Sequence, residues 1–430
     1  MTIRTPAASR IKPPIPPMES LRIAILLPGE LPVPCTQGGA IESTIQLLID
    51  QNEMHKRLRI TVFSPYEKSA KKLSTDYVFT CFRWIPRGKI LSFVNIIFKI
   101  VRRVVWRNLD LLDCQILKKY FLQDYFDRII IHGNTLHLLA IAKVVPKDKI
   151  VFYTHANLFE ERSRRNLHIG SSAGRYISVS HYIKQKVIEN AGVPEECVTV
   201  IKNPIDLGKF SESRNIDRPR DLAERFSIRP HDTVVLFVGR LVEGKGVLEL
   251  LLAIKSLSEE IAVKLLVIGT FGSKFAKGHE PSPYQKKVAD LAMTLENRVH
   301  LVGFVPNIAL PGYHSLADII VMPSLCEEAA GKVAMEGMAS GLPVICTNAG
   351  GIPEYVTDRC AIYVNRDDKI VASLAAAIKR LIQNPDLRRT MGASGAAISE
   401  DFSPQIYYKN YLNMASGGQE MMSALGLEVL

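Results

Sequence analysis

Short apolar runs alternate with helix-like patterns along the chain from residue 21 onward. In the helix-like segments, such as 41–51 and 181–192, apolar residues recur every three or four positions. The first series of apolar runs predicts strands at 21–28, 59–65, 128–133, 149–155, 174–180 and 198–206. Strands that alternate with helices are typical of parallel sheets covered by helices on both faces.

A second series of the same kind begins after a polar segment, 207–230, that has no clear period. It predicts further strands at 233–240, 263–270, 299–305, 317–324 and 342–348. We therefore predict an α/β protein with two Rossmann-like domains, at 21–207 and 208–403. Ligands of parallel sheets bind beyond the carboxyl ends of the strands, so the chemistry is expected in a cleft between the domains.

Composition agrees with two folded domains. The chain has 430 residues, of which 47% are hydrophobic and 23% charged, enough apolar surface for two cores. Residues 1–20 are rich in proline and lack the apolar core of a signal peptide, so we expect a loose tail. The seven cysteines are scattered without a CxxC pair, which favours reduced core residues in a cytoplasmic protein over disulfides or zinc.

The segment 324–356 carries the strongest chemical signal. Glu328 and Glu336 are eight positions apart, the first in a predicted strand-to-helix loop and the second one turn inside the helix. Carboxylates accept hydrogen bonds from the paired hydroxyls of sugars, and the N–H groups of a helix start suit phosphate. Taken alone, such a pair is also typical of charge compensation on a solvated helix face.

A second signal lies at 236–254, where Arg240 and Lys245 occupy a glycine-containing loop between a strand and a helix. Two cations held there could stabilise the negative charge of a diphosphate leaving group without a metal. The alternative is ordinary solvated surface charge. No GxGxxG or DxD pattern occurs, and the histidines are scattered, so neither a dinucleotide nor a metal is expected.

Together these motifs resemble those of the retaining family 4 glycosyltransferases, which have the GT-B fold. The segment SLCEEAAGKVAMEGMASGLPVI resembles the family's EX7E signature, and VGRLVEGKG resembles its diphosphate loop. The resemblance implies two Rossmann-like domains that face a central cleft, with a C-terminal helical segment, 404–430, packing back across them. It also implies that Glu328 meets the donor sugar, Glu336 meets the ribose, and Arg240 and Lys245 clamp the diphosphate.

Other residues gain roles only through this resemblance. His155, at a predicted strand end, would be a catalytic histidine near the donor sugar, although a lone histidine there is more often structural. The residues expected to line the donor site are Gly38, Gly39, Gly239, Val302, Gly303, Phe304, Val305, Gly331, Lys332 and Val333. Ala329 and Ala330 replace the family's usual Gly-Phe, and we interpret Glu327 as structural because only Glu328 has the family spacing.

The net charge of +11 favours an acidic partner. Residues 83–107 contain seven Lys or Arg and no acid, and as a helix they would separate apolar and basic faces. Such a segment could bind the anionic surface on the inner face of the membrane. An equal alternative is a helix that packs on the core and exposes its basic face to solvent. No motif supports nucleic-acid binding.

The sequence therefore predicts a metal-independent hexosyltransferase of cell-envelope polysaccharide biosynthesis. A nucleotide-diphosphate sugar, most simply a UDP-sugar, would be the donor substrate, and no cofactor is needed. The acceptor would be a glycan or a lipid-linked molecule. The alternatives are a nucleotide-sugar epimerase of the same fold and a binding module, for nucleotide-sugar or anionic lipid, without turnover.

Overall fold

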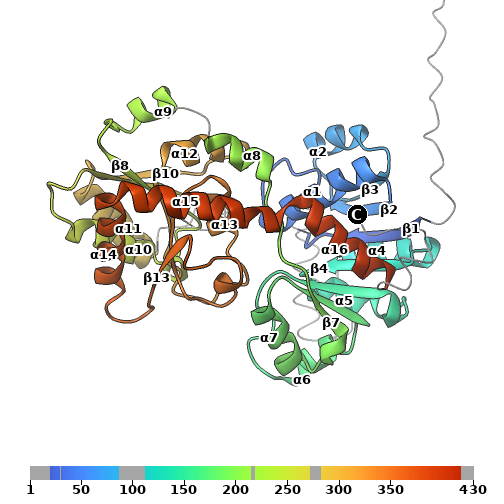
Figure 1. The fold of residues 1–430 in the computed structure, drawn as a ribbon. Helices are drawn as coiled ribbons and strands as arrows, with labels where there is room; N and C mark the ends of the chain where they lie inside the picture. Colours follow the sequence, from blue (N-terminus) through green and yellow to red (C-terminus); the bar gives the residue numbers. More distant parts are fainter. Residues whose placement is uncertain (1–19, 30, 87–111, 215–217, 272–281, 418–430) are drawn as a thin grey trace, which may run out of the picture.

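The structure is a computed structural model, and it describes residues 20–29, 31–86, 112–214, 218–271 and 282–417. Within these ranges the chain forms two lobes, each built around one parallel sheet (Figure 1). The predicted α/β architecture with two parallel sheets is thereby confirmed. The expected tail, 1–20, lies outside the described residues except for Ser20, and so does the end of the chain from residue 418.

The N-terminal lobe contains a seven-stranded sheet of order β3-β2-β1-β4-β5-β6-β7. Every neighbouring pair in it is parallel. The strands are β1 (Leu21–Leu26), β2 (Leu58–Pro65), β3 (Thr80–Ile85), β4 (Arg128–His132), β5 (Ile150–Thr154), β6 (Arg175–Ser178) and β7 (Val198–Val200). The helices of this lobe are α1 (Ala40–His55), α2 (Lys68–Leu73), α4 (Leu112–Gln123), α5 (Thr135–Ile141), α6 (Arg164–Gly170) and α7 (His181–Ala191).

The C-terminal lobe contains a six-stranded parallel sheet of order β10-β9-β8-β11-β12-β13. Its strands are β8 (Thr233–Val238), β9 (Val263–Ile268), β10 (Val299–Gly303), β11 (Ile319–Met322), β12 (Val344–Thr347) and β13 (Ala361–Val364). The remaining helices are α8 (Leu207–Ser211), α9 (Arg220–Arg225), α10 (Val247–Ser256), α11 (Pro283–Thr294), α12 (Leu310–Leu316), α13 (Lys332–Ala339), α14 (Ile370–Gln383), α15 (Pro385–Ser399) and α16 (Pro404–Ser416).

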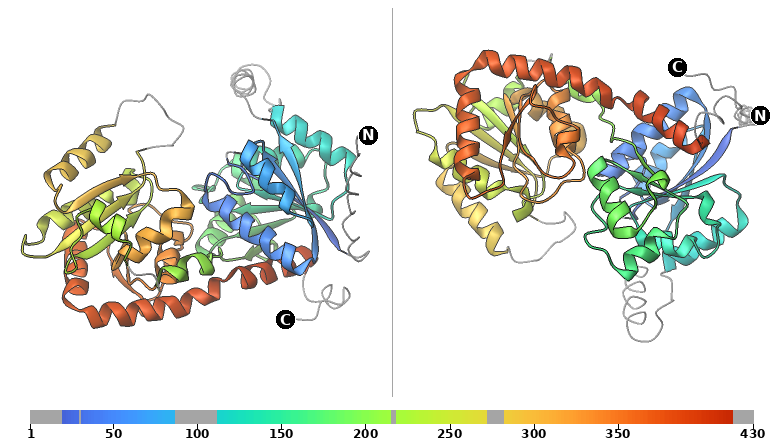
Figure 2. Two further views of the ribbon diagram at one scale, coloured as in Figure 1. Left: turned by 90° about the horizontal axis from the view of Figure 1, so that it is seen from above. Right: turned by 60° about the horizontal axis from the view of Figure 1, so that its bottom comes forward.

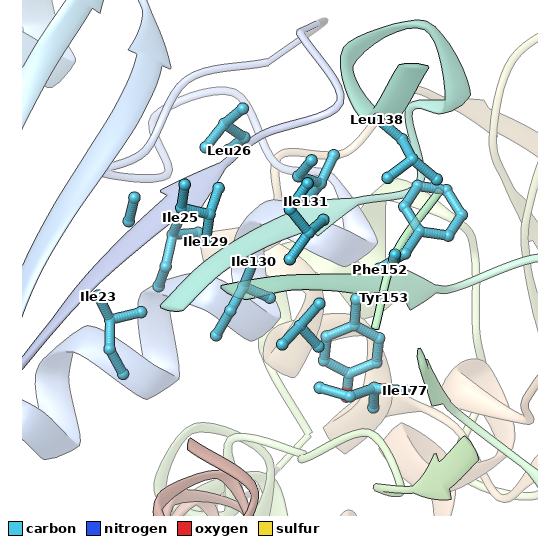
Figure 3. Close-up of a cluster of buried hydrophobic side chains, with 14 of the residues drawn as sticks. Ile23, Ile25, Leu26, Ile129, Ile130, Ile131, Leu138, Phe152, Tyr153 and Ile177 are labelled. Atoms are coloured by element: carbon cyan, nitrogen blue, oxygen red, sulfur yellow. The ribbon is translucent and has the colours of Figure 1, made fainter. Parts of the chain in front are cut away.

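Both sheets are buried on both faces. In β8, Val234 and Leu236 pack in one apolar cluster while Val235 and Phe237 pack in another on the opposite face. In the N-terminal lobe, neighbouring strands β1, β4 and β5 contribute adjacent buried side chains such as Ile25 (Figure 3). Burial of successive residues explains why these strands appear in the sequence as continuous apolar runs.

The last helix connects the two lobes. Helix α15 lies on the C-terminal lobe, whereas α16 continues onto the N-terminal lobe and packs beside α1 (Figures 1 and 2). Tyr407 and Tyr411 are buried in the N-terminal core, and the Tyr408 hydroxyl donates to Asn52 Oδ1 of α1 at 2.8 Å. The N-terminal lobe is thus completed by the end of the described chain.

Three sequence-based expectations were wrong or incomplete. Strands β3 and β13 were not predicted. The run 198–206 forms a strand only to Val200, because residues beyond it contact the other lobe. In the basic stretch 83–107, Arg83 to Ile85 belong to β3 rather than to a helix, and residues 87–107 lie outside the described residues.

Candidate active site

The order of the C-terminal sheet places two loops side by side. Its sequence order reverses between β8 and β11, which are neighbours in the sheet. The loops that follow these two strands are 239–246 and 323–331. Such a switch point is where parallel α/β sheets bind ligands. These are the two loops that carry the sequence motifs.

Lys245 and Glu328 meet between these loops. The Lys245 Nζ lies 2.5 Å from Glu328 Oε1, with side chains 24% and 15% exposed. The hydroxyl of Ser324 donates to the same carboxylate oxygen at 2.6 Å. The close approach of the loops depends on Gly246, which has φ +68° and whose added Cβ would lie 2.0 Å from the Pro323 carbonyl oxygen. The carboxylate is therefore held in a fixed position at the end of the sheet.

Arg240 lies in the same loop as Lys245, directly after Gly239 at the end of β8. Its side chain is exposed and forms no ion pair with a described residue. Glu327, next to Glu328 in sequence, is bound instead to Arg366 at 2.8 Å, with side chains 40% and 29% exposed. Of the two adjacent glutamates, only Glu328 reaches the Lys245 loop.

Glu336 and Lys332 form a second charged group, on the first turns of α13. Glu336 is 7% exposed, and burial raises the pKa of its carboxyl against the opposing effect of Lys332. Burial likewise lowers the pKa of the Lys332 amine, opposed mainly by Glu336. Both residues line a cavity of about 260 Å³, whose other walls include Asp206, Lys209 and Asn307. Glu328 is not among the residues that line this cavity; it lies instead beside Lys245.

The cavity lies between the lobes, because Ser43 and Gln46 of α1 also line it. Two hydrogen bonds cross there: Lys332 Nζ donates to the Ala40 carbonyl at 3.1 Å, and Asn307 Nδ2 to Ser43 Oγ at 3.4 Å. Gly38 and Gly39 precede α1 and have φ +79° and +108°, a backbone that suits glycine. The loop that contains Gly38 and Gly39 therefore faces the start of α13.

His155 approaches the cleft from the end of β5. Its ring is partly exposed, and burial together with the Lys332 charge lowers its pKa to about 3. It pairs with His132, at the end of β4, and lies against the ring of Tyr153 with centroids 4.2 Å apart. His132 was not singled out from the sequence.

The predicted base-reading segment follows β10. Gly303 has φ +83° and open space where a side chain would project, and Phe304 is 53% exposed. Val302 and Val305 pack on the core instead, as does Val333 of α13. Gly331 is the residue before α13, and its N–H is among those that a helix start leaves without a helical partner.

A second contact between the lobes lies at the turn after β12. Both carboxylate oxygens of Glu354 accept backbone N–H groups at the start of α7, from His181 at 2.6 Å and Tyr182 at 2.8 Å. The same turn donates from the Gly351 N–H to the Glu328 carbonyl at 2.7 Å. The turn thereby links the Glu328 loop to the N-terminal lobe.

One cluster among the described residues brings three types of potential metal ligand together. Asp113, Cys114 and His137 have potential ligand atoms within 4.8 Å of one another, in the N-terminal lobe. Asp113 Oδ2 and His137 Nε2 are 3.3 Å apart.

All seven cysteines are free. Among the helices that the structure describes, none is long and apolar enough to span a membrane.

Comparison with known proteins settles the family. One family model, Glycosyltransferase Family 4, matches residues 53–209, and another, Glycosyl transferases group 1, matches residues 220–397. The chain belongs to the group 1, family 4 glycosyltransferases. Relatives of this glycosyltransferase include the putative glycosyltransferase YtcC of Bacillus subtilis, 24% identical over 86% of both chains. The lipopolysaccharide 1,2-N-acetylglucosaminetransferase of Salmonella typhimurium is 31% identical over 54% of this chain and 57% of its own.

Solved structures show the same GT-B fold. A glycosyltransferase from Rickettsia africae superimposes with a TM-score of 0.70 at 18% identity, over 94% of this chain and 99% of its own. Anabaena HepE in complex with UDP-glucose superimposes with a TM-score of 0.67 at 20% identity, over 92% of this chain and 100% of its own. At these identities the likeness establishes the fold of this glycosyltransferase and not its substrates.

Proposed function

We propose that this glycosyltransferase moves a hexose-type sugar from a UDP-sugar to an acceptor with retention of the anomeric configuration and without a metal. The observation that carries the proposal is the contact between Lys245 and Glu328, which joins the predicted diphosphate loop to the predicted sugar loop at a switch point of the sheet. The cation can bind the diphosphate of a nucleotide sugar, and the adjacent carboxylate can bind the hydroxyls of its sugar.

The leaving diphosphate would be held by cations and backbone donors. An ammonium group has three donors, so Lys245 can keep Glu328 as a partner and still donate to a phosphate oxygen. Arg240, exposed in the same loop, would add a planar pair of donors. The Gly331 N–H lies at the start of α13, where the helix dipole favours an anion. Such fixed donors stabilise the charge that develops as the glycosidic bond breaks.

The sugar and the nucleoside would occupy opposite sides of that diphosphate. Glu328 would accept hydrogen bonds from sugar hydroxyls, with His155 facing the same sugar from the N-terminal lobe. Glu336 would bind the ribose within the interdomain cavity, and the backbone at Gly303 and Phe304 would read the base. UDP is the simplest donor nucleotide, in keeping with the UDP-glucose complex of HepE.

The acceptor is proposed to be a glycan or a lipid-linked molecule of the cell envelope. The relative from Salmonella that is named for lipopolysaccharide supports this class. A basic segment such as 83–107 would bring the enzyme to an anionic membrane surface, where a lipid-linked acceptor resides. Nucleic acid has no part in this proposal.

Product analysis tests the reaction. Purified enzyme is incubated with UDP-glucose, UDP-galactose or UDP-N-acetylglucosamine and lipid-linked acceptors, with and without EDTA, and products are examined by NMR. A transferred sugar with the donor's anomeric configuration, formed equally in EDTA, is the expected result. An inverted linkage or an EDTA-sensitive reaction would overturn those parts of the proposal. A new sugar epimer without transfer would indicate an epimerase, and an unchanged donor that still binds would indicate a binding module.

A further inference from the structure

Two histidines form a hydrogen-bonded pair behind the cleft. His132 Nδ1 and His155 Nε2 lie 2.8 Å apart, at the ends of the neighbouring strands β4 and β5. His132 is completely buried, whereas His155 keeps part of its ring exposed. The rings are stacked at 17° with centroids 5.0 Å apart. Only His155 can therefore meet a ligand, and His132 acts through it.

Both rings are neutral near pH 7. Burial lowers the pKa of His132 well below its ordinary value, and that of His155 to about 3 with the added effect of Lys332. A neutral imidazole carries one proton, so one of its nitrogens donates and the other accepts. The bond between the rings then has two arrangements, according to which ring donates.

The far nitrogen of His132 distinguishes these arrangements. His132 Nε2 is buried and has no hydrogen-bond partner. If His155 donated, the proton of His132 would lie on this nitrogen as a buried N–H without an acceptor. If His132 donates from Nδ1, only a lone pair is left there. Unpaired buried N–H groups are rare in native proteins, and unpaired acceptors are less so. The geometry therefore favours His132 Nδ1–H as the donor.

In that arrangement His155 must carry its proton on Nδ1. This nitrogen forms no hydrogen bond with a described residue, and His155 is the partly exposed ring of the pair. Lys332, across the cleft, carries a charge that would favour a bare nitrogen, and the acids Glu336, Glu42 and Asp206 near Lys332 place negative charge on the same side. An N–H donor at this position suits a hydroxyl oxygen of a sugar.

We propose that His132 is a positioning residue that holds His155 in the Nδ1–H tautomer, so that His155 donates a hydrogen bond to a hydroxyl oxygen of the donor sugar. The inference rests on the proposed function for its ligand, but the tautomer itself belongs to the free protein. Spectroscopy without substrate can therefore test the tautomer apart from catalysis.

Four variants separate this role from a structural one. The side-chain nitrogen of asparagine lies near the place of Nδ1 in histidine, and that of glutamine near Nε2. His132→Asn keeps an N–H donor at the place of His132 Nδ1, and His132→Leu removes it. His155→Asn keeps an N–H donor at the place of His155 Nδ1, and His155→Gln puts the donor at the place of Nε2. We expect His132→Leu and His155→Gln to lower kcat about tenfold, as for one lost hydrogen bond. The two asparagine variants should recover most of that loss.

Binding of UDP and thermal melting serve as controls, because the residues proposed to bind UDP belong to the C-terminal lobe and both histidines to the N-terminal lobe. Equal kcat in His132→Leu and His132→Asn, with UDP binding intact, would overturn the positioning role. Failure of the wild-type enzyme to bind UDP would instead contradict the proposed function. The tautomer of His155 would then still be tested by nitrogen NMR.

Nitrogen NMR of protein labelled with 15N-histidine reads the tautomer directly. Protonated and bare nitrogens of a neutral ring have separate shifts, and the His155 signals are those lost in His155→Asn. The inference predicts a protonated Nδ1 in the wild type at pH 7 and a mixture of tautomers in His132→Leu. A protonated Nε2 on His155 in the wild type would overturn it.

Discussion

Lys245 and Glu328 are 83 positions apart in the sequence, and their side chains lie 2.5 Å apart where β8 and β11 end. Both are only slightly exposed, so the pair is better shielded from solvent than a surface ion pair. The contact turns two separate sequence motifs into one candidate site. Its chemical role can be tested by removing either partner.

Replacing Glu328 with glutamine or Lys245 with methionine should lower kcat/KM by about 10²- to 10³-fold, the range for losing one preorganised transition-state contact. The side chains of both variants keep roughly the original length, so folding should persist, as thermal melting would check. Initial rates of sugar transfer provide the measurement.

The neighbouring ion pair supplies a matched control for these variants. Glu327→Gln breaks the contact between Glu327 and Arg366, which is more exposed. Because exposed ion pairs contribute little stability, this variant should keep activity within about twofold. If Glu327→Gln lost as much activity as Glu328→Gln, the assignment of the two glutamates would be wrong.

Glu354 should control how the lobes are oriented. Glu354→Ala removes both bonds to the start of α7 and should lower kcat by about tenfold to 10²-fold, because small misplacements of reacting groups are costly. The Kd of UDP should change little, since its proposed contacts lie in one lobe. Calorimetry and steady-state rates measure the two quantities.

Ser163→Ala serves as the comparison for Glu354→Ala. It removes a cap bond of 3.2 Å, to Asn166 N–H, that lies within the N-terminal lobe. The loss of such a cap costs about 1 kcal/mol of stability and should leave kcat unchanged. Equal effects of both variants on kcat would mean that Glu354 acts only through general stability.

Gly246 and Gly303, which both have positive φ angles, should respond differently to replacement by alanine. Gly246→Ala would force a Cβ to 2.0 Å from the Pro323 oxygen, so the site loops must separate. We expect transfer activity to be lost and the melting temperature to fall. Gly303→Ala meets nothing within 4 Å and should cost only about 1–2 kcal/mol for its φ. Similar melting of both variants would contradict the close packing of the two loops.

Much of the fold could be predicted from the sequence, because central parallel strands are continuous apolar runs. The unpredicted strands β3 and β13 both lie at sheet edges, where burial is partial, and Arg83 interrupts the apolar pattern of β3. The end of β7 was misplaced because Lys202 and Asn203 bind Tyr355 and its neighbour, about 150 positions away. The residues near 198–206 in the sequence give no indication of contacts with such distant residues.

The motifs of the candidate site could also be recognised in the sequence, but the residues that surround them in the structure could not. Glu328 and Lys245 stand in ordered motifs beside glycines, whereas His132 is one residue at the end of an apolar strand. Its significance comes only from the neighbouring strand β5, which brings His155 to 2.8 Å. The cavity residues Asp206, Lys209 and Asn307 likewise become neighbours of Glu336 only through the tertiary packing of the C-terminal lobe, in which α8 contacts α13.

Lowering the pH should destabilise the folded protein, because His314 is buried in its neutral form. His314 is 1% exposed, and burial, with a contribution from Lys209, lowers its pKa to about 3. Below pH about 6.5 the unfolded chain takes up a proton there that the folded protein does not. The free energy of unfolding should therefore fall by about 1.4 kcal/mol per pH unit between pH 6 and 4 from this residue.

Urea unfolding at several pH values measures this slope. His314→Asn keeps a polar group near Ser340, which binds His314 Nδ1 at 3.0 Å, but cannot titrate. The variant should show a shallower dependence on pH, whatever its absolute stability. Identical slopes in the two proteins would show that His314 is not held neutral.

Calorimetric titration of UDP in EDTA tests the proposed diphosphate site. The proteins compared are the wild type, Arg240→Ala and, as a control, Arg389→Ala, whose arginine is 75% exposed on α15. Loss of a charge-assisted contact should weaken binding by about 10- to 100-fold in Arg240→Ala only. Tight, metal-independent binding that depends on Arg240 but not on Arg389 is the predicted result. Absence of UDP binding to the wild type, or equal affinity in Arg240→Ala, would contradict the proposed diphosphate site.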